Sequence, residues 1–206
     1  MNADTLQDMR AGFSSEALGS QAVFRVALHA LSHPGRPLAM PIEAECPELG
    51  HRAAAVLLLA LLDADCTLWL SPTLAGSSTA AWLRFHTGCR CVDAAGQADV
   101  VWVAQGDAVP ELATLAQGSD ADPQGSATLV MDVPAFQGGE PLRLSGPGIQ
   151  TIQDLDVRGL PAGFVAQWAA NHAAFPRGVD VFLATHTEVC GLPRTACINA
   201  ESAMEA

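Results

Sequence analysis

The chain has no lysine, because the ten basic side chains among its 206 residues are all arginines. Without lysine, no residue can form a Schiff base with pyridoxal phosphate or with a carbonyl substrate, and no Walker-type lysine can reach a nucleotide phosphate. A genome rich in G and C explains the replacement, since alanine, glycine and proline are abundant as well. The available cations are therefore guanidinium groups, which hold phosphate or carboxylate in a fixed plane.

Charge and long apolar runs are also scarce. Charged residues make up 16% of the chain, where about a quarter is usual, and the net charge is −12. This acidity argues against nucleic acid and anionic membranes as partners. The longest apolar run, residues 53–62, is far shorter than the roughly 20 residues of a membrane-spanning helix, and the first residues lack a signal-peptide pattern. We therefore expect a cytoplasmic protein, part of whose charge-poor surface contacts another chain.

The cysteines lack the spacing of a metal site or of a disulfide framework. Cys89 and Cys91 flank a single residue, and no second pair lies near them in the sequence. Disulfide frameworks belong to shorter secreted chains. We expect six reduced thiols, no bound metal and no cofactor.

Apolar periodicity predicts a set of helices and short strands. The helices are expected at residues 16–32, 49–62, 77–87 and 161–173, with one or two helical turns at 110–116. The strands are expected at residues 37–42, 66–70, 100–104, 128–133, 141–145, 179–185 and 189–192. In the first helix, Phe24, Ala27, Leu28 and Leu31 share one stripe and are expected to be buried. This order of elements favours an α/β fold with a mixed sheet covered by helices.

The same pattern predicts one domain. Residues 16–197 form it, after a frayed amino terminus at residues 1–15 and before a loose acidic tail at residues 198–206. No internal repeat or long linker divides the chain.

A glycine-rich turn follows one of the expected strands and is the first candidate site. Alternation places Arg143 and Ser145 on one face of the strand, and Gly146-Pro147-Gly148 then turns the chain. The backbone N–H groups of this segment could form a small anion-binding nest. The alternative is a tight turn without a ligand, because Pro147 removes a donor and no third glycine completes a dinucleotide fingerprint.

Two further segments place arginine beside a titratable group. Arg84 and His86 end the helix expected at residues 77–87, where they could bind an anion or merely satisfy helix-end carbonyls. Asp180 enters a strand close to Arg177, where it could orient that arginine or a neighbouring one in a structural ion pair, or contact a ligand. No nucleophile motif accompanies them, and His86 and Asp180 are the available acid–base groups near arginines.

Six short segments occur in an order that identifies a family. They are LSHPG at 31–35, LRFHT at 83–87, GSATL at 125–129, LRLSGPGI at 142–149, FPRGVD at 175–180 and PRT at 193–195. The set closely resembles the PhnH family, subunits of the bacterial carbon–phosphorus lyase system. The resemblance covers residues from about 20 to 197.

The resemblance implies a homodimeric α/β protein whose fold looks like the large domain of pyridoxal-phosphate transferases without the cofactor. It implies a cytoplasmic core complex with the subunits PhnG, PhnI and PhnJ. That complex couples an alkylphosphonate to the ribose C1′ of ATP and displaces adenine. We expect this subunit to be inactive alone. The alternatives are a self-contained enzyme or anion-binding protein for a phosphorylated small molecule, or a purely architectural subunit.

The arginines yield one geometric expectation. A chain with a net charge of −12 attracts a phosphonate or triphosphate only where several guanidinium groups meet. We expect the strand and turn at residues 142–148 to converge with Arg177 or Arg194, and with Arg84 and His86 nearby. If each arginine instead bonds to its own carboxylate, the architectural interpretation is favoured.

Overall fold

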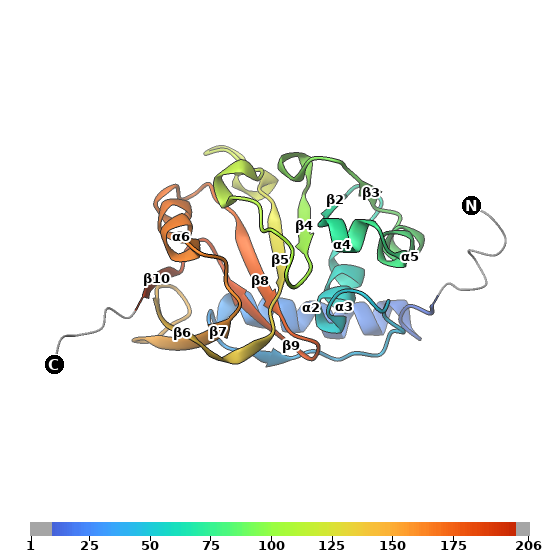
Figure 1. Ribbon diagram of the computed structural model, residues 1–206, viewed down its shortest axis with the longest axis horizontal. Coiled ribbons are helices and arrows are strands. Elements are labelled where there is room, and N and C mark those ends of the chain that lie inside the picture. Colours follow the sequence, from blue (N-terminus) through green and yellow to red (C-terminus); the bar gives the residue numbers. More distant parts are fainter. Residues whose placement is uncertain (1–9, 201–206) are drawn as a thin grey trace.

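A seven-stranded mixed sheet separates two hydrophobic cores (Figure 1). The computed structural model describes residues 10–200. In sheet order the strands are β1 (Leu38–Ala39), β9 (Glu188–Leu192), β8 (Asp180–Ala184), β5 (Thr128–Asp132), β4 (Val100–Val103), β2 (Thr67–Leu70) and β3 (Arg90–Cys91). β9 runs antiparallel to β1 and β8, and the other neighbours are parallel.

The central strands are apolar throughout because both of their faces are buried. In β4, Val100 and Trp102 point into one core, while Val101 and Val103 point into the other. A strand covered on both faces reads as a continuous apolar run rather than an alternating one. The prediction of a central strand at residues 100–104 is therefore confirmed, and the predicted mixed α/β sheet with covering helices is confirmed with it.

The first core lies under four helices. They are α2 (Glu16–Ser32), α3 (Arg52–Leu61), α4 (Pro72–Ala75) and α5 (Ser78–Thr87). Residues 53–59 of α3 are all buried, as the all-round apolar sequence predicts. The helix α5 has both expected caps: the Ser77 hydroxyl accepts a hydrogen bond from the N–H of Thr79, and Gly88 adopts a left-handed conformation with φ of 76°. None of the helices within residues 10–200 is long and apolar enough to cross a membrane.

The predicted buried stripe of α2 is confirmed at Ala27 and wrong at Phe24 and Leu28, while Leu31 is partly buried against the first core. Phe24 and Leu28 are 44% and 53% exposed, whereas Gly19, Val23, Ala27 and Ala30 are buried. The reason is the close approach of α2 to β9. A Cβ atom added to Gly191 would lie 2.6 Å from the backbone of Ala30, so small side chains have to face the sheet.

The second core lies under a small three-stranded sheet and one helix. The strands are β10 (Cys197–Ala200), β6 (Ala135–Ser145) and β7 (Gln153–Arg158), and the helix is α6 (Phe164–Ala173). Short 3-10 turns, η1 (Ala95–Gln97), η2 (Leu112–Thr114) and η3 (Pro123–Gly125), connect the larger elements. In Figure 1, α6 and the three-stranded sheet lie at the opposite end of the molecule from α4 and α5.

This second layer differs from the sequence prediction in two places. β7 was not predicted, and residues 137–139, which lie between the strands predicted at 128–133 and 141–145, belong to β6 at an irregularity in its pairing with β7. The boundary of the expected carboxyl-terminal tail also moves. Residues 197–200 pair with residues 142–145 of β6, and residues 201–206 lie outside the described part of the chain.

Candidate functional site

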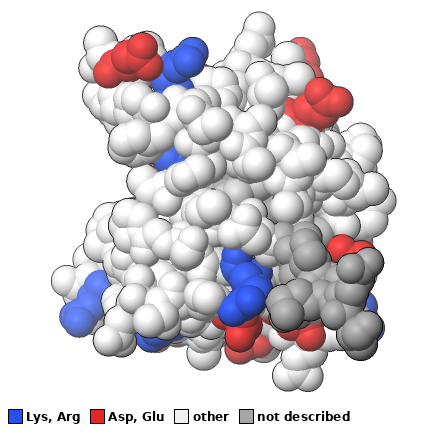
Figure 2. Space-filling model, turned by 90° about the vertical axis from the view of Figure 1, so that its left-hand side faces the viewer, with Lys and Arg blue, Asp and Glu red and all other residues white. Residues whose placement is uncertain are grey.

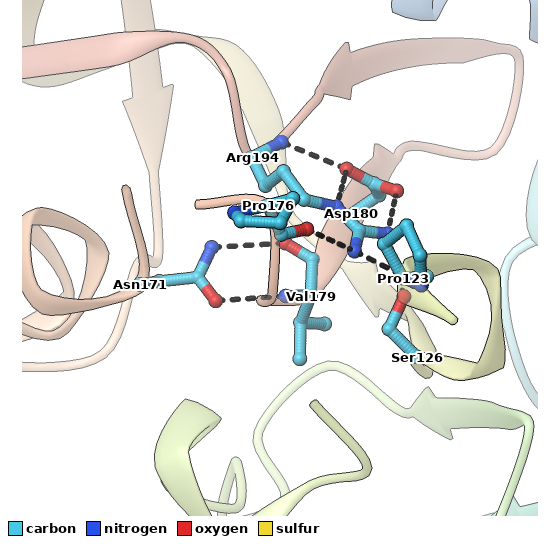
Figure 3. A network of polar contacts seen from close by, with 7 residues as sticks. All are labelled: Pro123, Ser126, Asn171, Pro176, Val179, Asp180 and Arg194. Atoms are coloured by element: carbon cyan, nitrogen blue, oxygen red, sulfur yellow. Dashed lines mark hydrogen bonds and ion pairs between the residues drawn. The ribbon is translucent and has the colours of Figure 1, made fainter. Parts of the chain in front are cut away.

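Arg194 and Asp180 form a bonded network at the start of β8 (Figure 3). The guanidinium donates to Asp180 through Nε, 3.2 Å from Oδ1, and through Nη2, 2.6 Å from Oδ2. Nη2 also donates to the Ser126 hydroxyl at 2.5 Å, and Nη1 donates to the carbonyls of Pro123 at 3.0 Å and Pro176 at 3.3 Å. We call these five residues the Arg194 network.

All five N–H groups of the Arg194 guanidinium therefore have a protein acceptor. The side chains of Arg194 and Asp180 are 13% and 23% exposed, so the pair is largely shielded from water. Asn171 ties the same region to α6, since its side-chain amide bonds both the N–H and the carbonyl of Val179. The network links the start of β8 to Pro123 and Ser126 before β5 and to Pro176 after α6. It leaves no N–H group of the Arg194 guanidinium free to bind an anion.

Two of the other three predicted arginines, Arg177 and Arg143, also face a carboxylate. The Nε atom of Arg177 lies 3.3 Å from Asp120, and that of Arg143 lies 3.9 Å from Asp154, its cross-strand neighbour in β7. These four side chains are about half or more exposed. Such surface pairs contribute roughly 0–1 kcal/mol each to stability.

The turn after β6 is packed against the chain rather than open to a ligand. Ser145 pairs with Cys197 of β10. Gly146 has a φ of 125°, and an added Cβ atom would lie 2.9 Å from the carbonyl of Thr195. Gly148 has a φ of 84° and contacts Ser32 so closely that a Cβ atom would overlap its carbonyl. Both positions need glycine because another part of the backbone lies in close contact there. This geometry fits the tight turn without a ligand, which was the alternative to an anion-binding nest.

Arg84 and His86 lie far from these segments. Their helix, α5, contacts β3 at one edge of the large sheet, while β6 and β10 lie at the other end of the molecule (Figure 1). The Nε2 atom of His86 bonds the carbonyl of Arg10 at 2.9 Å. Arg84 and His86 therefore do not join the other predicted residues, and His86 and Asp180 are not an acid–base pair. The turn after β6 does lie beside the segment that follows Arg194, because Gly146 contacts the carbonyl of Thr195, and Asp180 and Arg194 line one cavity of about 390 Å³.

Replacing Arg194 tests whether the network is structural. An Arg194→Met variant leaves the Asp180 carboxylate and two proline carbonyls without their partner, so we expect the free energy of unfolding to fall by about 3 kcal/mol. Chemical denaturation measures it. As a control, Arg177→Met removes an exposed pair and should cost at most about 0.5 kcal/mol. Equal effects of the two variants would contradict this account.

A second polar cluster lies at the carboxyl end of the parallel strands. Asp132, the last residue of β5, is only 6% exposed. Its Oδ1 atom accepts a hydrogen bond from Nε1 of Trp102, and its Oδ2 atom accepts one from the backbone N–H of His51, both at 2.9 Å. Ligand sites in open parallel sheets lie at this edge.

Two histidines complete this Asp132 cluster. The Nδ1 atom of His51 lies 2.9 Å from the carbonyl of Ala184, and because a carbonyl only accepts, Nδ1 carries the proton. The ring centroids of His51 and His186 lie 4.1 Å apart, with the ring planes tilted by 42°. His51 is buried and His186 is exposed. The cluster thus connects a buried carboxyl group to a histidine at the surface.

Burial is the main cause of the pKa shifts in the Asp132 cluster. It raises the pKa of the Asp132 carboxyl to about 6, against the pull of the nearby His51 imidazole and of the two N–H donors. Burial also lowers the pKa of His186, and the charges of His51 and Arg52 lower it further. Both shifts bring these groups closer to neutral at physiological pH.

The sequence analysis missed these residues because each looks like part of an apolar element. His51 directly precedes the apolar helix α3, and Asp132 ends an apolar strand. The available signal was an acidic residue at the carboxyl end of a buried parallel strand. The Asp132 cluster therefore brings together three titratable side chains that the sequence analysis did not single out.

Titration of Asp132 predicts a pH dependence. Because its pKa of about 6 in the folded protein exceeds the ordinary value of 3.8, the group contributes stability below pH 3.8 that is lost as the pH rises through 6. The free energy of unfolding relative to an Asp132→Asn variant should therefore fall by on the order of 3 kcal/mol between about pH 4 and pH 7. Denaturant titrations at a series of pH values measure this difference.

The exposed Asp154 provides the control for this titration. An Asp154→Asn variant should show no comparable change over the same pH range. A pH-independent difference between the protein and its Asp132→Asn variant would mean that Asp132 titrates as an ordinary carboxyl group.

The geometry defines an α/β protein in which Arg143, Arg177 and Arg194 face carboxylates, while a buried aspartate and two histidines lie at the carboxyl edge of the parallel strands. Residues 11–199 match the family described as bacterial phosphonate metabolism protein, PhnH. The chain belongs to this family, and the resemblance seen in the sequence motifs is confirmed.

Two relatives match over nearly their whole lengths. The PhnH subunit of alpha-D-ribose 1-methylphosphonate 5-triphosphate synthase from Rhizobium meliloti (strain 1021) is 36% identical over 189 residues, which are 92% of this chain and 94% of the relative. The putative C-P lyase subunit protein HtxG of Stutzerimonas stutzeri is 37% identical over 188 residues, 91% of this chain and 90% of the relative. Both are named as subunits.

Proposed function

We propose that the protein is a subunit of a carbon–phosphorus lyase core complex in phosphonate catabolism. In that complex it takes part in coupling an alkylphosphonate to the ribose C1′ of ATP with displacement of adenine. The observation that carries the proposal is the match, over more than nine-tenths of the chain, to two proteins that are each named as a subunit. The subunit acts together with PhnG, PhnI and PhnJ rather than alone.

The arginine geometry supports the dependence on partners. A triphosphate needs several unpaired cationic groups in one place. Arg143, Arg177 and Arg194 each face a carboxylate instead. In this proposal the cations that hold the triphosphate come from the other subunits.

The surface supports contact with other chains. Figure 2 shows the side of the molecule that is on the left in Figure 1, and charged side chains on it are few and scattered. Several large apolar side chains are also exposed elsewhere, including Leu18, Phe24 and Leu28 on α2 and Phe175 after α6. A charge-depleted surface with exposed aromatic side chains is typical of a protein interface.

Reconstitution of the complex tests the proposal. The protein should co-purify with co-expressed PhnG, PhnI and PhnJ, and the purified assembly should release adenine from ATP with methylphosphonate, as measured by chromatography. The isolated chain should release none. Adenine release by the isolated chain would establish the self-contained enzyme, and failure to co-purify would reject membership of the complex.

We also propose that the isolated protein is a homodimer that contacts its copy through the outer face of α2. Leu18, Phe24 and Leu28 are between 44% and 68% exposed on this helix. A standard interface buries about 1,600 Å² in total. The family resemblance implies the dimer, and the exposed apolar stripe supports its location.

Sedimentation at micromolar concentration tests the dimer. The wild-type protein should be dimeric, and a Phe24→Arg, Leu28→Arg variant should be monomeric, because the charges cannot be buried without partners. Ile152→Arg, which alters an exposed apolar residue outside α2, should leave the dimer intact. A monomeric wild-type protein would reject the homodimer, and a dimeric double variant would place the interface elsewhere.

The proposal extends to the fold and to the cellular compartment. We infer that the large sheet corresponds to the large domain of pyridoxal-phosphate transferases in a form without the cofactor, which is supported by its mixed seven strands between covering layers. The six cysteines are free, as is usual in the reducing cytoplasm where we place the protein.

Incubation with pyridoxal phosphate tests the cofactor-free assignment. Because the sequence has no lysine, no aldimine absorbance should survive dialysis. A stable aldimine band, or a metal present near one per chain by elemental analysis, would contradict it.

A further inference from the structure

A short segment before α2 contributes to the wall of a cavity of about 580 Å³ near the amino end of α3. Arg10, Cys46, Glu48 and His186 are among the residues that line this cavity. Arg10 belongs to residues 10–13, which contact both α5 and residues 45–48. We call residues 10–13 the strap. In Figure 1 the amino end of α2, where the strap leads into the helix, lies on the same side of the molecule as α5.

The helix α5 holds the backbone of the strap. The carbonyl oxygen of Arg10 accepts two hydrogen bonds, from Nε1 of Trp82 at 3.0 Å and from Nε2 of His86 at 2.9 Å. Because a carbonyl only accepts, Nε2 of His86 carries a proton. For His86 the sequence left two roles open, an anion contact and a contact with helix-end carbonyls. In the structure its ring bonds the strap.

The strap is also bonded to the segment that lines the cavity. The guanidinium of Arg10 donates to the carbonyl of Cys46 at 3.0 Å and to the carboxylate of Glu48 at 2.9 Å. The backbone N–H of Glu45 donates to the carbonyl of Ala11 at 3.0 Å, and the N–H of Ala11 donates to the Glu45 carboxylate at 3.4 Å. The same residues therefore hold the strap and form part of the cavity wall.

Two glycines allow the strap to lie close to the helices. A Cβ atom added to Gly12 would lie 3.0 Å from Nδ1 of His86, so the backbone of the strap rests against the imidazole ring. A Cβ atom added to Gly19 of α2 would lie 2.5 Å from the ring of Phe13. Phe13 is partly buried against the first core. A larger side chain at either glycine has to displace the strap or its neighbour.

These contacts favour a closed strap but do not tie it into the core. The side chains of Arg10 and Glu48 are 46% and 83% exposed, and such a pair stabilises little. Segments with few buried apolar contacts open locally at a lower free energy than the whole fold. Opening has a cost, since Trp82 is only 2% exposed and its indole N–H loses its acceptor. The strap is therefore closed at equilibrium and able to open alone.

We propose that the strap is a lid of the cavity. It opens as a unit when its bonds to Trp82, His86 and Glu48 break, and Arg10 then leaves the cavity wall. Access from solution to the cavity, and to His186 within it, is set by the position of the strap. His86 is a positioning residue of this lid, which gives the LRFHT segment at residues 83–87 a role that the proposed function does not use.

The Cys46 thiol reports the state of the lid. Cys46 lines the cavity, is only 6% exposed, and has its carbonyl bonded by Arg10. Cys190 is fully buried in the second core, on the other face of the large sheet, and serves as the internal reference. Opening of the strap should expose Cys46 and leave Cys190 buried, whereas unfolding of the whole chain exposes both.

Labelling of the full chain with N-ethylmaleimide, followed by peptide mass spectrometry, measures the rate at each thiol. A Gly12→Val variant places a side chain against His86 and should raise the rate at Cys46 about tenfold or more, because two hydrogen bonds to Arg10 are weakened. The rate at Cys190 should not change. Gly76→Val is the matched control, since the nearest atom to an added Cβ there is at 3.4 Å, and it should change neither rate.

A second pair of variants tests the hydrogen bond from His86. His86→Leu removes the donor to Arg10 and should also raise the rate at Cys46, while His86→Gln keeps an N–H donor and should restore part of the protection. Unchanged labelling of Cys46 in Gly12→Val and His86→Leu overturns the lid. Equal increases at Cys46 and Cys190 in both variants overturn it as well, because the strap would then be an inseparable part of the core.

Discussion

The bonds of Arg194 fix the relative positions of four chain segments. Its backbone N–H and its guanidinium hold the start of β8 through Asp180, while its remaining donors hold the loop before β5 and the loop after α6. Arg194 itself lies directly after β9. Removing a largely shielded charge from such a network leaves several acceptors unsatisfied at once. The amino-terminal edge of the sheet is therefore held by polar bonds and the interior by apolar packing.

The two edges of the sheet have different roles in this account. At the edge with Arg194, cationic and anionic groups neutralise each other. At the opposite edge, Asp132 is buried at an energetic cost, and His186 lines a cavity together with arginines and glutamates. A buried carboxyl group with a raised pKa beside a cavity is typical of a binding site rather than of a structural ion pair.

Local patterns predicted the elements well. Ser77 and Gly88 gave both ends of α5, and the apolar run at residues 100–104 gave a central strand. The buried face of α2 could not be predicted from spacing alone. Two neighbouring rows of apolar residues, one with Val23 and Ala30 and one with Phe24 and Leu31, both have helical spacing. The contact between Ala30 and Gly191 decides between them, and this contact is tertiary.

The site was harder to predict for a similar reason. Arg143, Arg177 and Arg194 lie in the segments by which the sequence resembles the family, but a sequence does not show which carboxylate faces each guanidinium. Asp132 and His51 are 81 residues apart, and their contact depends on the order of strands in the sheet. The motif at residues 145–148 was identified, but the structure shows a backbone contact with Ser32 where an anion nest was one of two interpretations.

A double-mutant cycle on Arg194 and Asp180 tests most directly that the Arg194 network is structural. The free energies of unfolding of the protein, Arg194→Met, Asp180→Leu and the double variant give the coupling energy between the two side chains. The account predicts a coupling of about 2 kcal/mol, as expected for residues that share one bonded network. Additivity within about 0.5 kcal/mol would contradict it, because independent side chains do not hold an edge of the sheet together.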